Sequence, residues 1–188
     1  MFLILEGLDN VGKDTQIKKL TTYLVKKCKQ LVHVIHYSAI SGITPEESRE
    51  YSEHLYYDMF DIMAETDFMK MGTSLIFNRS HIGEHVYSPI YRNYSGEYVF
   101  DIEQKFINSS FWPKVYLVVF IDNPENLIKR DDGLSFSTKM ENKKLEIELF
   151  VDAYYKSHIT HKCLINICDK GPNVVYNKII EFIEGENA

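Results

Sequence analysis

Short apolar segments bounded by polar sequence recur along the chain and predict β-strands. They cover residues 2–5, 31–36, 74–77, 115–121 and 163–167. The fourth, VYLVVFI, is a nearly continuous apolar run, which is typical of a central parallel strand buried on both faces. Because helical patterns separate these segments, we expect an α/β fold with a parallel sheet covered by helices on both sides.

Helical spacing of apolar residues fills the intervals between the strands. Ile17, Leu20 and Leu24 predict a helix within residues 14–29, and the sequence around residues 174–183 predicts a helix that closes the fold.

Residues 44–63 predict a longer helix with a defined start. Thr44 is suited to the N-cap, Glu47 completes a capping box with it, and Pro45 fits the first turn. We expect the apolar stripe of this helix to pack in the core or against a second copy, rather than to bind a cofactor. The stripe consists of Tyr51, Leu55, Tyr56, Met59, Phe60 and Met63.

Length and composition indicate one domain spanning residues 1–188. A chain of 188 residues with 45% hydrophobic and 26% charged residues is ordinary for a soluble globular domain. Residues 131–144 depart from the periodic patterns, because they are rich in Ser, Thr, Lys and acidic residues around Gly133. We predict that this segment is a mobile flap, or lid.

Charge and cysteine content narrow the class of protein. A net charge of −6 argues against an extended nucleic-acid surface but suits small anionic ligands held by a few cations. Cys28, Cys163 and Cys168 lack C-x-x-C spacing, which favours reduced thiols over disulfides or zinc. The first strand begins at once and no run of about 20 apolar residues follows, so we expect a cytoplasmic protein without membrane contact.

A phosphate-binding loop follows the first strand. Residues 3–16 read LILEGLDNVGKDTQ and contain the frame G-x-x-x-x-G-K at a strand-to-helix junction. Such a loop aims backbone N–H groups at phosphate oxygens, and its lysine reaches the β- and γ-phosphates of a nucleoside triphosphate. A glycine turn that binds nothing is the weaker alternative. The expected nucleotide-binding residues are Gly7, Asn10, Val11, Gly12, Lys13, Asp14 and Thr15.

One position of the loop departs from the motif. Asp14 stands where the motif expects the Ser or Thr that ligates Mg²⁺, and the hydroxyl arrives one place later at Thr15. A carboxylate is a competent Mg²⁺ ligand but adds negative charge beside the phosphates. We therefore predict a Mg²⁺ site at Asp14 and Thr15 and leave its full ligand set open.

Two regions of the chain resemble thymidylate kinases. The first is similar to the family's E-G-x-D-x-x-G-K-S-T-Q opening, and Asn78-Arg79-Ser80 occupies the place of its D-R-[YHFS] segment. The resemblance implies a P-loop kinase fold with a five-stranded parallel sheet, a lid that closes over ATP, a nucleotide acceptor and commonly a homodimer. The matching residues of the opening are Glu6, Gly7, Asp9, Gly12, Lys13, Thr15 and Gln16.

The resemblance also implies roles for individual residues. Lys13 and Arg79 would act in catalysis, with Arg79 holding the acceptor phosphate; a surface salt bridge is the alternative for Arg79. Asp9 would accept a hydrogen bond from the sugar 3′-hydroxyl, unless it only caps the turn. Tyr87 falls at an aromatic of the base pocket, and Arg92 at an arginine found in some members. Two further tyrosines are candidates for base contact, with core packing favoured for both: Tyr37 and Tyr91.

Two departures from the family bear on catalysis. Asn10 stands where many members place a catalytic arginine, so a cation from the lid would compensate. Arg130 is the candidate that its chemistry favours. An ion pair of Arg130 with Asp131 or Asp132 in solvent is an equal alternative. Asn78 replaces the usual carboxylate, and we hypothesise that Asp14 supplies it instead; impaired catalysis is the alternative. The candidate lid cations are Arg130, Lys139, Lys143 and Lys144.

The resemblance and the departures together predict a kinase that transfers the γ-phosphate of ATP to a deoxynucleoside monophosphate, dTMP or a related pyrimidine. A nucleoside kinase is the main alternative, but a neutral hydroxyl acceptor benefits from a general base, and residues 36–40 offer no carboxylate. The same region lacks the arginine of the family's F-P-x-R segment, so a monophosphate would depend on Arg79 and Arg92. A nucleotide-binding module without catalysis and a kinase acting on a polymer are the remaining alternatives.

Overall fold

The predicted parallel sheet is present in the computed structural model, which describes residues 1–38, 40, 42–70 and 72–185. Its five strands are paired in parallel in the order β2-β3-β1-β4-β5. The fifth strand begins two residues earlier than the apolar pattern predicts. The strands are β1 (Phe2–Gly7), β2 (Leu31–His36), β3 (Thr73–Asn78), β4 (Val115–Ile121) and β5 (His161–Asn166).

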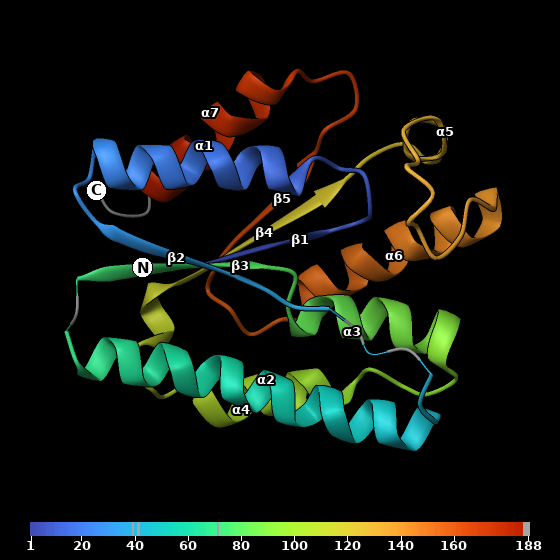
Figure 1. Cartoon of the computed structure of the whole chain (residues 1–188), viewed down its shortest axis with the longest axis horizontal. Helices are drawn as coiled ribbons and strands as arrows, with labels where there is room; N and C mark the ends of the chain where they lie inside the picture. Colours follow the sequence, from blue (N-terminus) through green and yellow to red (C-terminus); the bar gives the residue numbers. More distant parts are fainter. Residues whose placement is uncertain (39, 41, 71, 186–188) are drawn as a thin grey trace.

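Helices cover both faces of the sheet (Figure 1). The helices α1 and α7 lie on one face, and α2, α3, α4 and α6 lie on the other, as expected for a parallel sheet. The carboxyl ends of the strands lie on the side to which the arrow of β4 points. The helical segments are α1 (Lys13–Lys26), α2 (Pro45–Phe68), α3 (His81–Tyr87), η1 (Ser88–Arg92), α4 (Tyr98–Phe106), η2 (Trp112–Lys114), α5 (Pro124–Lys129), α6 (Met140–Lys156) and α7 (Pro172–Gly185).

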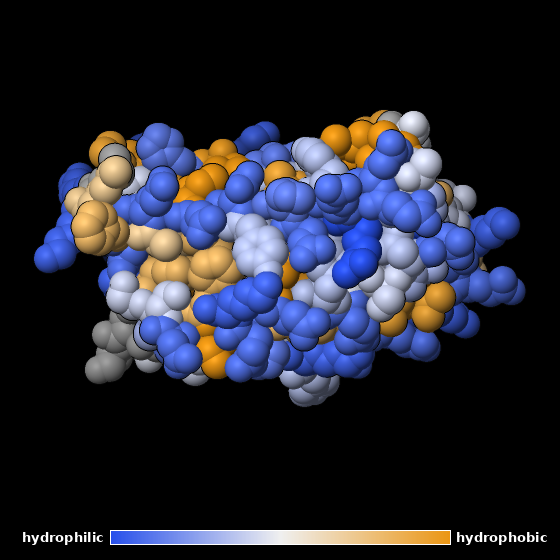
Figure 2. All heavy atoms as spheres, turned by 90° about the horizontal axis from the view of Figure 1, so that it is seen from below, coloured by the Kyte–Doolittle hydropathy of each residue, from blue (hydrophilic) through white to orange (hydrophobic). Residues whose placement is uncertain are grey.

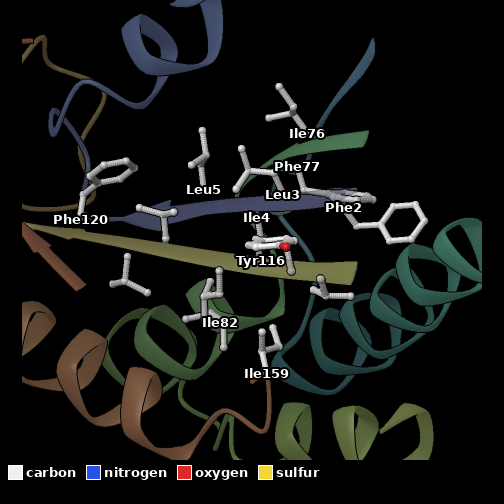
Figure 3. Close-up of a cluster of buried hydrophobic side chains, with 14 of the residues drawn as sticks. Phe2, Leu3, Ile4, Leu5, Ile76, Phe77, Ile82, Tyr116, Phe120 and Ile159 are labelled. Carbon is white, nitrogen blue, oxygen red and sulfur yellow. The ribbon is translucent and has the colours of Figure 1, made fainter. Parts of the chain in front are cut away.

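The core lies on both sides of β1, which is buried along its whole length. Successive side chains of a strand point to opposite faces. Figure 3 shows Leu3 and Leu5 on one side of β1, while Ile4 lies on the side of Ile82 and Ile159. Burial on both faces explains why β1 and β4 read as continuous apolar runs rather than as alternating patterns.

The capping box at the start of α2 is confirmed. The Thr44 side chain accepts a hydrogen bond from the Glu47 backbone N–H (3.2 Å), and the Glu47 carboxylate accepts one from the Thr44 N–H (2.8 Å). The helix continues to Phe68, beyond the predicted end. Most of its apolar stripe is buried in the chain's own core, whereas Tyr51 is 40% exposed. The residues of the stripe that are buried are Tyr56, Met59, Phe60 and Met63.

The irregular flap is shorter than predicted. Residues 131–139 lack regular secondary structure, but α6 begins at Met140, so residues 140–144 are helical. Lys143 is buried and its ammonium contacts the Glu146 carboxylate at 2.9 Å. Because Lys143 is buried as well as paired, it is poorly placed to act as a lid cation over ATP.

Three further expectations concern membrane contact, dimerisation and the state of the cysteines. In the part of the chain that the structure describes, no helix combines the length and apolarity needed to cross a membrane. Hydrophilic residues predominate on the face seen from below in Figure 2, with hydrophobic patches between them. Homodimerisation stays a prediction. The three cysteines are unbridged, as predicted.

A buried carboxylate ties three segments together beneath the sheet. Glu103 on α4 accepts hydrogen bonds from the Ser157 hydroxyl (2.8 Å) and the His158 backbone N–H (2.5 Å), and it contacts His81 Nε2 at 2.6 Å. Burial alone would raise the pKa of Glu103, but the hydrogen bonds and the charge of His81 outweigh it and hold the pKa below its ordinary value.

Replacing Glu103 tests how much its hydrogen bonds and its contact with His81 contribute to stability. A carboxylate whose pKa is lowered by folding stabilises the protein at pH values above its ordinary pKa of 4.5. This contribution is lost as the pH falls through the pKa of the folded state. We expect Glu103→Gln to lower the free energy of unfolding by about 3 kcal/mol at pH 7, since breaking a buried pair typically costs that much. In urea titrations the difference from the wild type should shrink below pH 4.5; an equal difference at all pH values would contradict this account.

Candidate active site

Two positions of the loop between β1 and α1 have backbone conformations that favour glycine. Gly7 has φ of 134°, and a Cβ there would lie 2.3 Å from the carbonyl oxygen of Phe120 on the neighbouring strand β4. Gly12 has φ of 81° and immediately precedes α1. Both values belong to the left-handed region that glycine adopts without strain. The glycines therefore form the predicted turn at a strand-to-helix junction.

Lys13 lies folded against this loop. Its Nζ donates hydrogen bonds to the carbonyl oxygens of Gly7 and Leu8, both at 2.7 Å. Burial lowers the pKa of Lys13 to about 8, because the charged form loses hydration; Glu6 and Asp9 partly oppose this. A polyanion brought to the loop would favour the charged form of this buried ammonium.

A cleft of about 570 Å³ opens over the loop. Arg79 and Arg130 lie on its walls, so cations face the loop from two other segments. Gly7, at the end of β1, does not line the cleft. A hollow of about 700 Å³ around Met1 and Asp67 shares no lining residue with the cleft. Parallel sheets bind ligands at the carboxyl ends of their strands, which favours the cleft as the ligand site. The cleft-lining residues of the predicted loop set are Asn10, Val11, Gly12, Lys13, Asp14 and Thr15.

Asp14 and Asn78, two of the positions that depart from the kinase motifs, are in contact. Pairing of β1 with β3 places Asn78 opposite Leu5, at the start of the loop. The Asn78 amide donates to the Asp14 carboxylate at 2.7 Å, and Asn78 Oδ1 is buried without a hydrogen-bond partner among the described residues. With the nearby hydroxyl of Thr15, this cluster offers the oxygen donors that Mg²⁺ prefers.

A second, smaller cavity lies beside the cleft. It has a volume of about 40 Å³, and its lining includes residues of α2 and α3. Arg79, which follows β3, lines both the cavity and the cleft. Its guanidinium donates to Asp9 at 2.9 Å, and this partner is only 13% exposed. Arg79 therefore pairs inside the site, at the boundary of the two spaces.

Tyr87 and Arg92, two of the predicted substrate-binding residues, both line the smaller cavity. The Tyr87 hydroxyl is buried and has no hydrogen-bond partner in the described part of the chain. Burial raises the pKa of Tyr87 well above its ordinary value, so the hydroxyl keeps its proton. An unpaired buried hydroxyl costs free energy, which a ligand that bonds to it would recover.

Glu84 organises the far wall of this cavity, and the sequence reasoning missed it. Its buried carboxylate accepts hydrogen bonds from Arg92 and Tyr94, and from Tyr98 at 3.2 Å. The only signal in the sequence was its spacing of three residues from Tyr87, which places both on one side of α3.

Glu6 joins the loop to α3. Its fully buried carboxylate accepts from the backbone N–H groups of Gly7 and Gly83, both at 3.1 Å, and from the N–H and hydroxyl of Ser80. A carboxylate at the amino end of a helix also meets the positive end of the helix dipole. Glu6 therefore fixes the position of the segment that carries Arg79.

The flap contacts the loop through polar side chains. The Asn10 amide donates to Ser135 at 3.1 Å and to Asp131 at 3.4 Å. Arg130, at the end of α5 just before the flap, is paired with Asp122 and not with either neighbouring aspartate. Its side chain is 45% exposed and lines the cleft, so it remains the best-placed lid cation of the predicted set.

Comparison with known proteins supports the architecture. A scan against models of protein families and a search of curated proteins found no significant match. The chain is similar to the structure of YorR from Bacillus subtilis in complex with phosphorylated GDP, with 20% identity, a TM-score of 0.68 and coverage of 100% of this chain and 98% of that one.

Two thymidylate kinases are also similar in structure. The enzyme from Candida albicans has 14% identity and a TM-score of 0.63 over 99% of this chain and 92% of that one. The enzyme from Ehrlichia chaffeensis has 15% identity and a TM-score of 0.67 over 97% and 98%. With its parallel sheet and its glycine loop before α1, the chain shares the fold of these two thymidylate kinases.

Proposed function

We propose that the protein transfers the γ-phosphate of ATP to a deoxynucleoside monophosphate, dTMP or a related pyrimidine nucleotide, and releases the two diphosphates. The observation that carries the proposal is the place of Arg79, which lines both the cleft over the glycine loop and the neighbouring cavity. A guanidinium at this boundary is suited to hold an acceptor phosphate in line with the terminal phosphate of ATP.

On the donor side, the chain supplies positioning and positive charge. Phosphoryl transfer depends mainly on aligning two anions and neutralising charge on the group that moves. Lys13 and the loop N–H groups bind the phosphates, and Arg130 adds positive charge from the end of α5. Mg²⁺, when bound, neutralises phosphate charge; the oxygens of Asp14 and Thr15 would hold it.

On the acceptor side, the residues exchange partners when substrate binds. Arg79 turns from Asp9 to the monophosphate, which frees Asp9 to accept a hydrogen bond from the sugar 3′-hydroxyl. Arg92, oriented by Glu84, adds positive charge to the same cavity. The Tyr87 hydroxyl is available to a polar edge of the base.

The hydrogen bonds of Glu6 favour a monophosphate over a nucleoside as acceptor. A nucleoside kinase benefits from a carboxylate that removes a proton from the 5′-hydroxyl. Glu6 lines the acceptor cavity, but its oxygens already accept from Gly7, Ser80 and Gly83. Asp9 is paired with Arg79. A monophosphate is already anionic and needs no such base.

An acceptor panel tests the proposed reaction. Release of ADP is measured by a coupled assay with ATP, Mg²⁺ and one of three acceptor classes: nucleosides, deoxynucleoside monophosphates or single-stranded DNA. We expect turnover with the monophosphates, and the highest kcat/KM with a pyrimidine. Binding of ATP without turnover on any acceptor would instead support a nucleotide-binding module.

Arg79→Lys tests the role of the boundary residue. We expect KM for the acceptor monophosphate to rise by about 10-fold or more, because a hydrogen bond to a charged group contributes about 1.5–3 kcal/mol and lysine lacks the forked geometry. KM for ATP should change much less. Arg49→Lys, an exposed arginine on α2, is the matched control. An unchanged acceptor KM would contradict the assignment of Arg79.

A further inference from the structure

An aromatic ring of the flap sits in the acceptor cavity. Phe136 lines this cavity although it belongs to the irregular segment that follows Arg130. Its ring lies 5.0 Å from the ring of Tyr91 at an interplanar angle of 17°, and 5.5 Å from the ring of Tyr87. Tyr91 is held in place by a hydrogen bond to Glu146 on α6. A flap side chain is thus stacked on a fixed aromatic platform.

With Phe136 in this place, the cavity is too small for a nucleotide. Ligand pockets usually enclose about 300–1,000 Å³. The cleft over the glycine loop, where ATP is proposed to bind, reaches that range with about 570 Å³. The cavity proposed for the acceptor has only about 40 Å³. An acceptor therefore requires that something leave the cavity, and Phe136 is its one lining residue from the flap among those that the structure describes.

The contacts of the flap suit a segment that moves. Phe136 is 50% exposed, so removing its ring from the cavity does not open the core. The polar contacts of the flap with the loop are made by the Asn10 side chain to Ser135 and Asp131. The Tyr87 hydroxyl remains buried beside the ring without a partner in the described chain, which points to a ligand that would bond to it.

We propose that Phe136 is a removable plug of the acceptor pocket, and that the base of the acceptor displaces it and stacks on Tyr91. The inference rests on the proposed function, because its ligand is a deoxynucleoside monophosphate. The Tyr87 hydroxyl then bonds to the edge of the base. Phe136 competes with the substrate for one aromatic surface and weakens acceptor binding.

Removal of the ring tests the competition. Binding of dTMP is measured by titration calorimetry for the wild type, for Phe136→Ala and for Phe68→Ala, a control that removes a ring 86% exposed at the end of α2. We expect Phe136→Ala to bind dTMP roughly 2- to 10-fold more tightly, the range that corresponds to losing one aromatic contact. Phe68→Ala should match the wild type, and ADP affinity should be the same in all three proteins.

Fluorescence follows the displacement itself. The chain has one tryptophan, the buried Trp112, so Phe136→Trp adds a second fluorophore in the plug position. We expect dTMP to shift its emission to longer wavelength, because the indole moves into water. Equal or weaker dTMP binding by Phe136→Ala would overturn the plug and leave the proposed function standing. If no deoxynucleoside monophosphate binds either protein, both the proposed function and the plug are wrong.

Discussion

Replacing Lys13 by methionine is expected to reduce kcat by about 10³-fold, the upper range for losing one group that stabilises charge in a transition state. The change removes the ammonium that lies against Gly7 and Leu8 at the floor of the donor cleft. Methionine fills a similar space without a charge. Steady-state kinetics with saturating ATP and dTMP measure the loss, and calorimetry with ADP measures nucleotide affinity, which should fall as well.

The stability of this variant should change in the opposite direction to its activity. Burial lowers the pKa of Lys13 to about 8, so below that pH the folded protein carries a charged group that burial disfavours. Lys13→Met removes that cost, and we expect a melting temperature at or above that of the wild type. Lys18→Met on the exposed side of α1 is the control and should retain full activity. Loss of activity together with unfolding would contradict a catalytic assignment.

The second large effect is expected at the pair formed by Asp14 and Asn78. Asp14→Ser should weaken the apparent Mg²⁺ affinity by about 10- to 100-fold, the usual result of disturbing a metal's supporting ligands. Asn78→Asp alone places a second carboxylate against the first, where the amide now donates at 2.7 Å, and the repulsion should weaken binding of the anionic nucleotide.

The double variant separates compensation from impaired catalysis. Asp14→Ser with Asn78→Asp returns the carboxylate to the end of β3 and a hydroxyl to the position after Lys13, so we expect it to recover most of the activity lost in Asp14→Ser. The dependence of kcat on Mg²⁺ concentration is the measurement for all three variants. Unchanged metal dependence in Asp14→Ser, or losses that simply add in the double variant, would show that Asp14 does not substitute for the missing carboxylate.

The structural features that the sequence could predict depend on local or repeating patterns. Burial on both faces makes β1 and β4 continuous apolar runs, and the capping box of α2 needs only residues three apart. The glycine loop is likewise local, because it occupies one strand-to-helix turn. Even the contact of Asn78 with Asp14 follows from a parallel sheet once β1 and β3 are neighbours.

The remaining features depend on packing between distant segments. Phe136 belongs to a segment without periodicity, and nothing near it in the sequence indicates that it reaches Tyr91. The burial of Lys143 depends on the start of α6, which the polar composition of the flap concealed. Glu84 gains its partners from the chain beyond α3, where Arg92 and other donors converge on it. Such contacts leave no regular pattern in the sequence.

Transfer of labelled phosphate from ATP to dTMP is the most direct test of the proposed kinase reaction. The protein is incubated with Mg²⁺, dTMP and ATP that carries the label in its γ-phosphate, and the nucleotides are then separated and identified by mass. We expect labelled dTDP, formed in equal amount to ADP and about 10³-fold more slowly with Lys13→Met. Label that stays in ATP, or that appears only as inorganic phosphate, would show that the protein does not transfer phosphate to dTMP.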